Sequence, residues 1–159
     1  MELTNLNHVF TMEVLNDEYF MKQALAEAKR ALDKDEVPVG AVIVSGNKII
    51  ARGHNLTQTL NDVTAHAEMQ AITSAANHLG AKYLLDCTLY VTLEPCIMCG
   101  GALFWSQIAK IVYGATDEKR GAHTTGKNLY HPKTVVIGGV LEEESSIMLT
   151  TFFKQKRLK

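Results

Sequence analysis

Residues 86–99 read DCTLYVTLEPCIMC, a predicted β-strand that runs directly into the start of a predicted helix. Residues 88–92 carry the β-branched and aromatic side chains that strands favour. Pro95 suits the first turn of a helix, because its missing N–H would have no partner there. Cys96 and Cys99 lie three residues apart, so one face of this helix can present both sulfur atoms. Two thiolates at this spacing can bind one metal ion, and zinc favours such ligands.

A second motif, His66-Ala67-Glu68, begins thirty residues before Cys96. His66, Cys96 and Cys99 are three ligands of the types that zinc prefers, and they leave the fourth tetrahedral position to water. Zinc would lower the pKa of that water to about 7. H-x-E followed by P-C-x-x-C is the signature of zinc-dependent base and nucleoside deaminases. In such a reaction Glu68 would take up the proton of the water, protonate a ring nitrogen of the substrate and assist the departing ammonia.

A closed structural zinc site is the main alternative, and it would need a fourth protein ligand. Cys87 is the obvious candidate, but it precedes the strand that Cys96 follows. At about 3.3 Å per strand residue the two lie some 25–30 Å apart in an extended chain, so Cys87 is expected to be a buried apolar residue. Four further histidines are interpreted as surface or loop residues: His54, His78, His123 and His131.

The order of predicted elements indicates an α/β fold. Hydrophobic periodicity, turn residues and capping residues predict, in order, a helix over 17–33, a hairpin of 39–44 and 48–52, a helix over about 65–79 with Thr64 as its N-cap, a strand over 88–92, a helix over 95–107, strands over 108–114 and 134–138, and a helix over 142–156. Such alternation implies a mixed sheet with helices on both faces. Residues 1–16 are expected to be an N-terminal extension, and 17–159 a single domain.

The composition is that of an ordinary globular protein. The 159 residues are 47% hydrophobic and 21% charged, and the net charge of -1 gives no overall attraction to nucleic acid or to anionic membranes. No apolar run approaches the roughly 18 residues of a membrane span, and the first 17 residues show no secretory signal. Three cysteines, two of them in a metal motif, fit a reducing cytoplasm. We therefore expect a cytoplasmic protein.

Several stretches together resemble the bacterial tRNA-specific adenosine deaminases of the cytidine deaminase-like superfamily. They are EYFMKQALAEAKRALDKDEVPVGAVIV, the asparagine of RGHN, DVTAHAEMQAI, DCTLYVTLEPCIMCGGAL, KIVYGA and FFKQKR, within residues 17–158. The EVPVGAV and TLEPC contexts favour the tRNA enzymes over bacterial guanine deaminases. The resemblance implies a three-layer α/β/α fold with a five-stranded mixed sheet, a homodimer, and one zinc ion per subunit. It also implies that the substrate is the wobble adenosine of a tRNA anticodon arm, converted to inosine.

The resemblance also implies roles for individual residues. By position, the zinc ligands would be His66, Cys96 and Cys99, the proton shuttle Glu68, and the substrate contacts Asn55, Pro38, Val39 and Ala67. Asn55 would hydrogen-bond the flipped nucleoside, although an asparagine in this loop could equally be a turn residue. Pro38 and Val39 would form an apolar wall against the base, although both are also natural at the entry to a strand.

The C-terminal helix of the family holds RNA, and this chain ends in aromatic and basic residues that could do so. They are Phe152, Phe153, Lys154, Lys156, Arg157 and Lys159. The rings could stack on a nucleotide while the cations meet phosphates. Alternatively, the phenylalanines belong to the core and the cations serve the helix C-terminus.

The segment 116–132, TDEKRGAHTTGKNLYHP, departs from the family pattern. It is shorter by about five residues than the corresponding glycine-rich loop of the tRNA enzymes, which borders the substrate. Lys119, Arg120 and Lys127 could contact phosphate, or they could be solvated surface charges.

The sequence is compatible with three functions. The first is adenosine-to-inosine deamination in tRNA. The second is deamination of a free base or nucleoside of guanine, cytosine or adenine type, which the net charge of -1 favours mildly. The third is a zinc-bearing partner subunit without catalysis, against which Glu68 argues, because a structural zinc site has no use for such a carboxylate.

Overall fold

The sheet at the centre of the computed structural model has five strands in the order β2-β1-β3-β4-β5. The structure describes residues 15–159. Its elements are α1 (Asp17–Asp33), β1 (Gly40–Ser45), β2 (Lys48–His54), α2 (Ala67–Leu79), β3 (Cys87–Leu93), α3 (Ile97–Ser106), β4 (Lys110–Ala115), the 3-10 helix η1 (Ala122–Thr125), β5 (Val135–Ile137) and α4 (Glu142–Arg157). The pairs β1–β2 and β1–β3 are antiparallel, whereas β3–β4 and β4–β5 are parallel. The predicted mixed sheet is confirmed.

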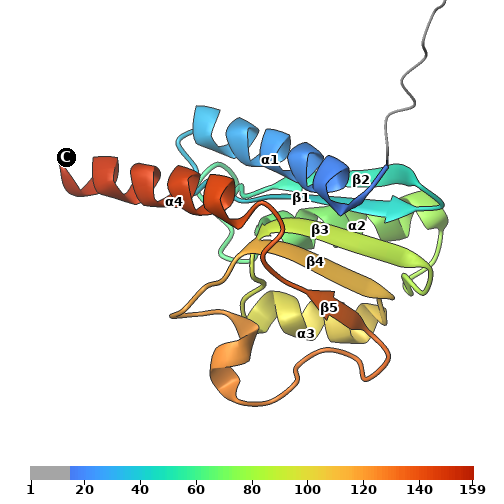
Figure 1. The fold of residues 1–159 in the computed structure, drawn as a ribbon. Coiled ribbons are helices and arrows are strands. Elements are labelled where there is room, and N and C mark those ends of the chain that lie inside the picture. The colour runs from blue at the N-terminus through green and yellow to red at the C-terminus, as the bar shows by residue number, and fades with distance from the viewer. Residues whose placement is uncertain (1–14) are drawn as a thin grey trace, which may run out of the picture.

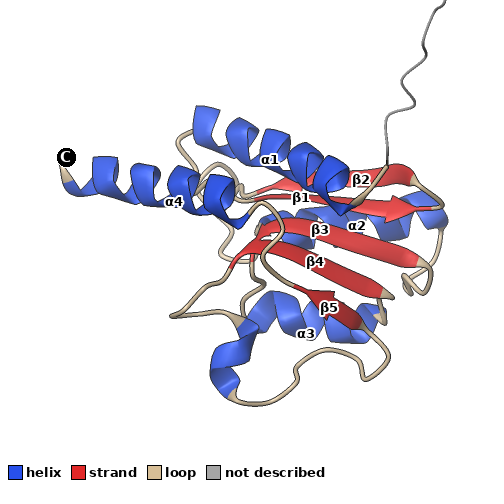
Figure 2. Ribbon diagram, in the orientation of Figure 1, coloured by secondary structure: helices blue, strands red, loops and turns tan. Residues whose placement is uncertain are grey.

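Two layers of helices enclose this sheet, as Figures 1 and 2 show. Successive side chains of a strand point to opposite faces, and each face has its own core cluster. On one face Val42, Tyr90 and Val112 pack with Phe20 and Met21 of α1. On the other face the core combines inward-facing strand residues with those of α2 and α3, including Ile43, Leu89, Val91, Ile111, Ala71 and Leu103. The predicted three-layer α/β/α fold is therefore confirmed.

The starts of three helices differ from the sequence prediction. Asn16, assigned to the N-terminal extension, is the N-cap of α1 and accepts a hydrogen bond from the Tyr19 N–H at 2.9 Å. Thr64 is not the cap of α2, because its N–H and hydroxyl both bind Asp62 Oδ1. The N-cap of α2 is His66 and that of α3 is Cys96. Of the rest of the predicted extension, Leu15 is exposed, and residues 1–14 lie outside the described residues.

Glycine allows α2 to lie close against the hairpin. A Cβ at Gly53 of β2 would lie 2.5 Å from the Ala67 carbonyl oxygen, far inside van der Waals contact. The first turn of α2 therefore sits directly on β2, and His66 and Glu68 are fixed relative to the sheet. None of the helices within residues 15–159 has the length and apolarity that a membrane span requires.

Candidate metal centre and active site

The N-termini of α2 and α3 bring the two sequence motifs together. His66 and Cys96 have extended backbones as N-caps, with ψ of 156° and 176°, and Cys99 lies in the first turn of α3. An N-cap side chain projects beyond the end of its helix, so both residues can reach a common point. Glu68 lies in the first turn of α2, and both it and His66 line the same cavity although they are only two residues apart.

Three residues, His66, Cys96 and Cys99, form a group (the metal group) with the dimensions of a tetrahedral zinc site. Their ligand atoms all lie within 4.8 Å of one another. His66 Nδ1 lies 3.6 Å from Cys96 Sγ and 3.5 Å from Cys99 Sγ. Metal–ligand bonds of about 2.0 Å to nitrogen and 2.3 Å to sulfur place such atoms about 3.6 Å apart in a tetrahedron. Cys87 is not a member of this group, so the donor set suits a zinc ion with three protein ligands.

The proton affinities in this group depend on mutual hydrogen bonds and burial. The hydrogen bond from Cys99, joined by one from His66, lowers the pKa of Cys96 to about 4. The hydrogen bond with Cys96, together with burial, raises the pKa of Cys99. Burial raises the pKa of Glu68 to about 7, and its side chain is almost fully enclosed. A carboxyl group of this kind can both hold and release a proton near neutral pH.

A cavity of about 800 Å³ opens onto the group. His66, Glu68 and Cys96 contribute its polar interior, and its apolar walls are Val37, Val39, Leu93 and Leu149. Its exposed cationic residues are Lys119, Arg120, Lys156 and Arg157. The cavity therefore combines an interior that contains the candidate metal ligands with a basic opening.

Residues 15–115 match the family model of the cytidine and deoxycytidylate deaminase zinc-binding region. The chain belongs to this deaminase family. The tRNA-specific adenosine deaminase of Bacillus subtilis is 49% identical over 148 residues, which cover 90% of this chain and 92% of that protein. The family that the sequence motifs indicated is therefore confirmed.

Two solved structures show how far the similarity extends. One comes from a study of A-to-I editing by tRNA deaminases at the wobble position of transfer RNA; it is 44% identical, with a TM-score of 0.77 over 82% of this chain and 99% of that chain. The other is a guanine deaminase from Bacillus subtilis, 45% identical, with a TM-score of 0.61 over 64% of this chain and 65% of that chain.

Most residues expected to contact a substrate in this deaminase lie in the cavity. Val39, Asn55 and Ala67 line it, and Asn55 is only 7% exposed. The Asn55 side-chain oxygen also accepts the Thr57 N–H at 3.4 Å, so the turn interpretation and a cavity position coexist. Pro38 is buried but does not line the cavity, and its neighbour Val37 does. A substrate contact by Pro38 stays a prediction.

The residues of α4 expected to bind RNA divide into two groups. Phe153, Lys156 and Arg157 line the cavity, whereas Lys154 is exposed and does not. The side chain of Phe152 is 6% exposed, so its ring packs in the protein and cannot stack on a nucleotide. For Phe152 the core alternative is correct.

Two histidines interpreted as plain surface or loop residues have carboxylate partners. His54 Nδ1 lies 3.2 Å from Glu27 Oε2, and its side chain is 13% exposed. His123 Nδ1 lies 2.7 Å from Oε1 of Glu94, a residue with a buried side chain. The sequence motifs assign no role to Glu94, which lies within TLEPC. A carboxylate ending an apolar strand is a signal that could have found it, because a buried charge needs partners.

Proposed function

We propose that this protein is a zinc-dependent hydrolytic deaminase that converts adenosine to inosine at the wobble position of a tRNA anticodon. One observation carries the chemistry: buried Glu68 shares a cavity with His66 and Cys96 of the three-ligand group. The basic opening of that cavity and the 49% identity to a tRNA-specific adenosine deaminase support tRNA as the substrate.

The roles of the metal-site residues follow from their chemistry. His66, Cys96 and Cys99 would hold one zinc ion per subunit. When bound, zinc supplies Lewis acidity, which lowers the pKa of water in the coordination position that three protein ligands leave open.

Glu68 is the proposed catalytic residue. It accepts the proton that the attacking water loses and transfers it to the adenine ring nitrogen. It then accepts the second proton, from the hydroxyl group added to the ring carbon, and passes it to the departing amino group. Water and adenosine thus yield inosine and ammonia. Its pKa of about 7, raised by burial, suits both uptake and release of the proton. Asn55, Val39 and Ala67 would hold the base, since all three line the same cavity.

The RNA itself would be held by the basic opening of the cavity. Lys119, Arg120, Lys156 and Arg157 can neutralise phosphates of the anticodon arm, and Phe153 offers a ring 46% exposed for stacking. This local basic surface removes the objection that the net charge of -1 disfavours nucleic acid.

A direct test compares substrates on the zinc-loaded protein. The substrates are an anticodon stem-loop with a wobble adenosine, the same stem-loop with a wobble guanosine, and free adenosine, guanine and cytosine. We expect inosine only from the first, measured by mass spectrometry of the digested RNA. Ammonia from a free base, with an inert stem-loop, would overturn the tRNA assignment.

Deamination of a free base is the second candidate, and the 45% identity to a guanine deaminase favours it. The salt dependence of turnover distinguishes the two candidate functions. Because phosphate contacts release counterions, stem-loop turnover should fall steeply between about 50 and 200 mM salt, whereas free-base turnover should hardly change. Inactivity of the zinc-loaded protein on every substrate would instead support a non-catalytic partner subunit.

We further propose a homodimer in which α3 forms part of the interface. Ile97, Gly101 and Trp105 follow one another at four-residue steps, so they share a face of this helix. Ile97 is 56% and Trp105 75% exposed, and the space above Gly101 is open. Light scattering should give the mass of a dimer for the wild type and of a monomer for Trp105→Glu. A monomeric wild type would refute this proposal.

Two expectations about organisation complete the proposal. We infer that residues 17–159 form one domain that follows an extension of residues 1–16. The reason is that α1 and α4, from opposite ends of the chain, pack on the same sheet.

We also infer a cytoplasmic location. A tRNA substrate and two thiolate ligands support it, because thiols remain reduced in the cytoplasm.

A further inference from the structure

The buried carboxylate of Glu94 binds a loop that is distant in the sequence. Glu94 directly follows β3 and lies two residues before Cys96, and it is 3% exposed. Its Oε1 accepts the Asp117 N–H at 3.1 Å, and its Oε2 accepts the His123 N–H at 2.9 Å. The His123 ring adds Nδ1 contacts of 2.7 and 2.8 Å to the two oxygens. One carboxylate therefore holds both ends of the loop formed by residues 117–123.

This loop is also bound to the backbone around Cys96. The Ala122 N–H donates to the Pro95 carbonyl oxygen at 2.9 Å, and Gly121 forms an isolated antiparallel bridge with Cys96. Within the loop, Asp117 Oδ1 accepts the N–H groups of Lys119 and Arg120 at 3.1 and 3.0 Å. The loop is thus internally braced and attached to the turn that carries a proposed metal ligand.

Gly121 shows how closely the loop approaches this carboxylate. A Cβ at Gly121 would lie 2.4 Å from both Cδ and Oε1 of Glu94. The backbone of Gly121, with φ of -62° and ψ of 153°, is one that any residue can adopt. Glycine is therefore required here by space and not by conformation, and a side chain would push the loop away from Glu94.

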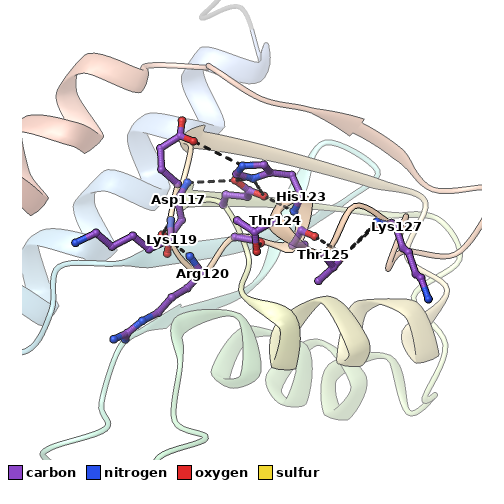
Figure 3. Close-up of polar contacts among 11 residues, drawn as sticks. Asp117, Lys119, Arg120, His123, Thr124, Thr125 and Lys127 are labelled. Atoms are coloured by element: carbon purple, nitrogen blue, oxygen red, sulfur yellow. Dashed lines mark hydrogen bonds and ion pairs between the residues drawn. The ribbon is translucent and has the colours of Figure 1, made fainter.

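The opposite side of the loop faces the substrate cavity. Asp117, Lys119 and Arg120 line that cavity, and in Figure 3 the long side chains of Lys119 and Arg120 extend away from His123. Across residues 15–159 neither of these two cations has an ion-pair partner. They are free to meet phosphate, provided that the loop holds them at the cavity.

We propose that Glu94 is a positioning residue for RNA binding, which fixes loop 117–123 so that Lys119 and Arg120 stand at the cavity beside the metal group. The inference rests on the proposed function, since RNA is the ligand that these cations would bind. Glu94 acts through the loop and touches no reacting atom. Its loss should therefore weaken binding of the ground state and of the transition state equally, which raises KM and leaves kcat unchanged.

The test uses four variants of the full zinc-loaded chain. Glu94→Ala removes both acceptors, and Glu94→Gln keeps one acceptor oxygen. Gly121→Ala displaces the loop while the carboxylate remains. Glu118→Ala is the matched control, because Glu118 is an exposed acid of the same loop, 3.7 Å from His123 Nε2. Each variant is measured for zinc content, for stem-loop KM and kcat, and for amide hydrogen exchange of residues 117–123.

We expect Glu94→Ala to raise KM about ten- to a hundredfold, as loss of hydrogen bonds to a charged group implies, and to speed loop exchange at least about tenfold. Gly121→Ala should have the same effects, Glu94→Gln a smaller one, and Glu118→Ala neither. Zinc content and kcat should stay at the wild-type values.

Two results would overturn the inference. One is loop exchange that is unchanged in Glu94→Ala and Gly121→Ala. The other is a loss of zinc and kcat with KM unchanged, which would make Glu94 a support of the metal site. Wild-type activity on the stem-loop tests the proposed function separately. If that activity is absent, hydrogen exchange still decides whether Glu94 positions the loop.

Discussion

The metal group and loop 117–123 border the same cavity, but the chain holds them by different means. His66, Cys96 and Cys99 lie at the first turns of α2 and α3, so the backbones of these two helices fix their positions. Both ends of the loop are held by one side chain, the carboxylate of Glu94, which accepts hydrogen bonds from the N–H groups of Asp117 and His123. Ligands placed by helix backbone keep their positions when one side-chain contact is lost, whereas we expect the loop to loosen when the Glu94 carboxylate is removed. Chemistry and substrate binding should therefore be separable by mutation.

Glu68→Gln should have the largest effect, and only on the chemical step. The amide cannot take up a proton from water, so kcat/KM should fall about 10²–10⁴-fold, the usual contribution of a general acid–base group. Zinc content, stem-loop affinity and Tm should be unchanged, because glutamine has nearly the same shape and no buried charge. Glu118→Gln, at an exposed position, is the control. Retention of full activity by Glu68→Gln would falsify the assigned role.

Phe152→Ala and Phe153→Ala should divide α4 into a structural and a binding half. Phe152 is 6% exposed, so truncation should lower the free energy of unfolding by about 3 kcal/mol, measured by urea denaturation. Phe153 is 46% exposed and lines the cavity, so its truncation should cost less than about 1 kcal/mol of stability. It should instead raise the stem-loop Kd several-fold through lost stacking. The reverse assignment of the two effects would contradict the packing described for α4.

The sequence predicts the metal-binding half of the site well for physical reasons. The ligand spacing, Pro95 at the start of a helix and the strand before it are all local signals, and a tetrahedral donor set restricts how they can meet. The element order likewise predicts the mixed sheet, since hydrophobic periodicity is local. The sequence predicts the helix boundaries less accurately. Thr64 has the residue type of an N-cap, but its N–H and its hydroxyl both bind Asp62.

The contacts of loop 117–123 could not be predicted, because they join residues far apart in the sequence and no ligand motif or coordination geometry links those residues. Nothing in the sequence around His123 indicates that its ring binds Glu94, and nothing around His54 indicates that its ring contacts Glu27. The pattern of α4 could not decide between Phe152 and Phe153 either. The two are adjacent, and only the direction in which the helix packs makes one buried and the other exposed.

Lys119→Ala and Arg120→Ala test the loop half directly, with a smaller expected effect. Each removes one phosphate contact, so the stem-loop Kd should rise about tenfold and the slope of log Kd against log salt should fall by about one. The kcat at saturating RNA should be unchanged. Lys154→Ala is a matched control, because Lys154 is a nearby cation that does not line the cavity. Equal effects of all three substitutions would indicate a diffuse electrostatic field and not a positioned loop.

Asp35→Asn should have the smallest effect, and one of opposite sign. The Asp35 carboxylate pairs with Lys156, a cation of α4 that lines the cavity and that also lies 5.4 Å from the centre of the Phe152 ring. Asparagine tolerates the positive φ of 59° at this position, so the turn should keep its shape. Without the carboxylate, Lys156 does not have to break an ion pair before it binds phosphate, so stem-loop affinity should rise. The rise should be less than about fivefold, because exposed ion pairs are weak. Anisotropy titrations at two salt concentrations measure this rise, which should shrink at the higher one. A loss of affinity would mean that the pair holds Lys156 in its binding position, so that α4, like loop 117–123, needs a distant carboxylate to present its cations.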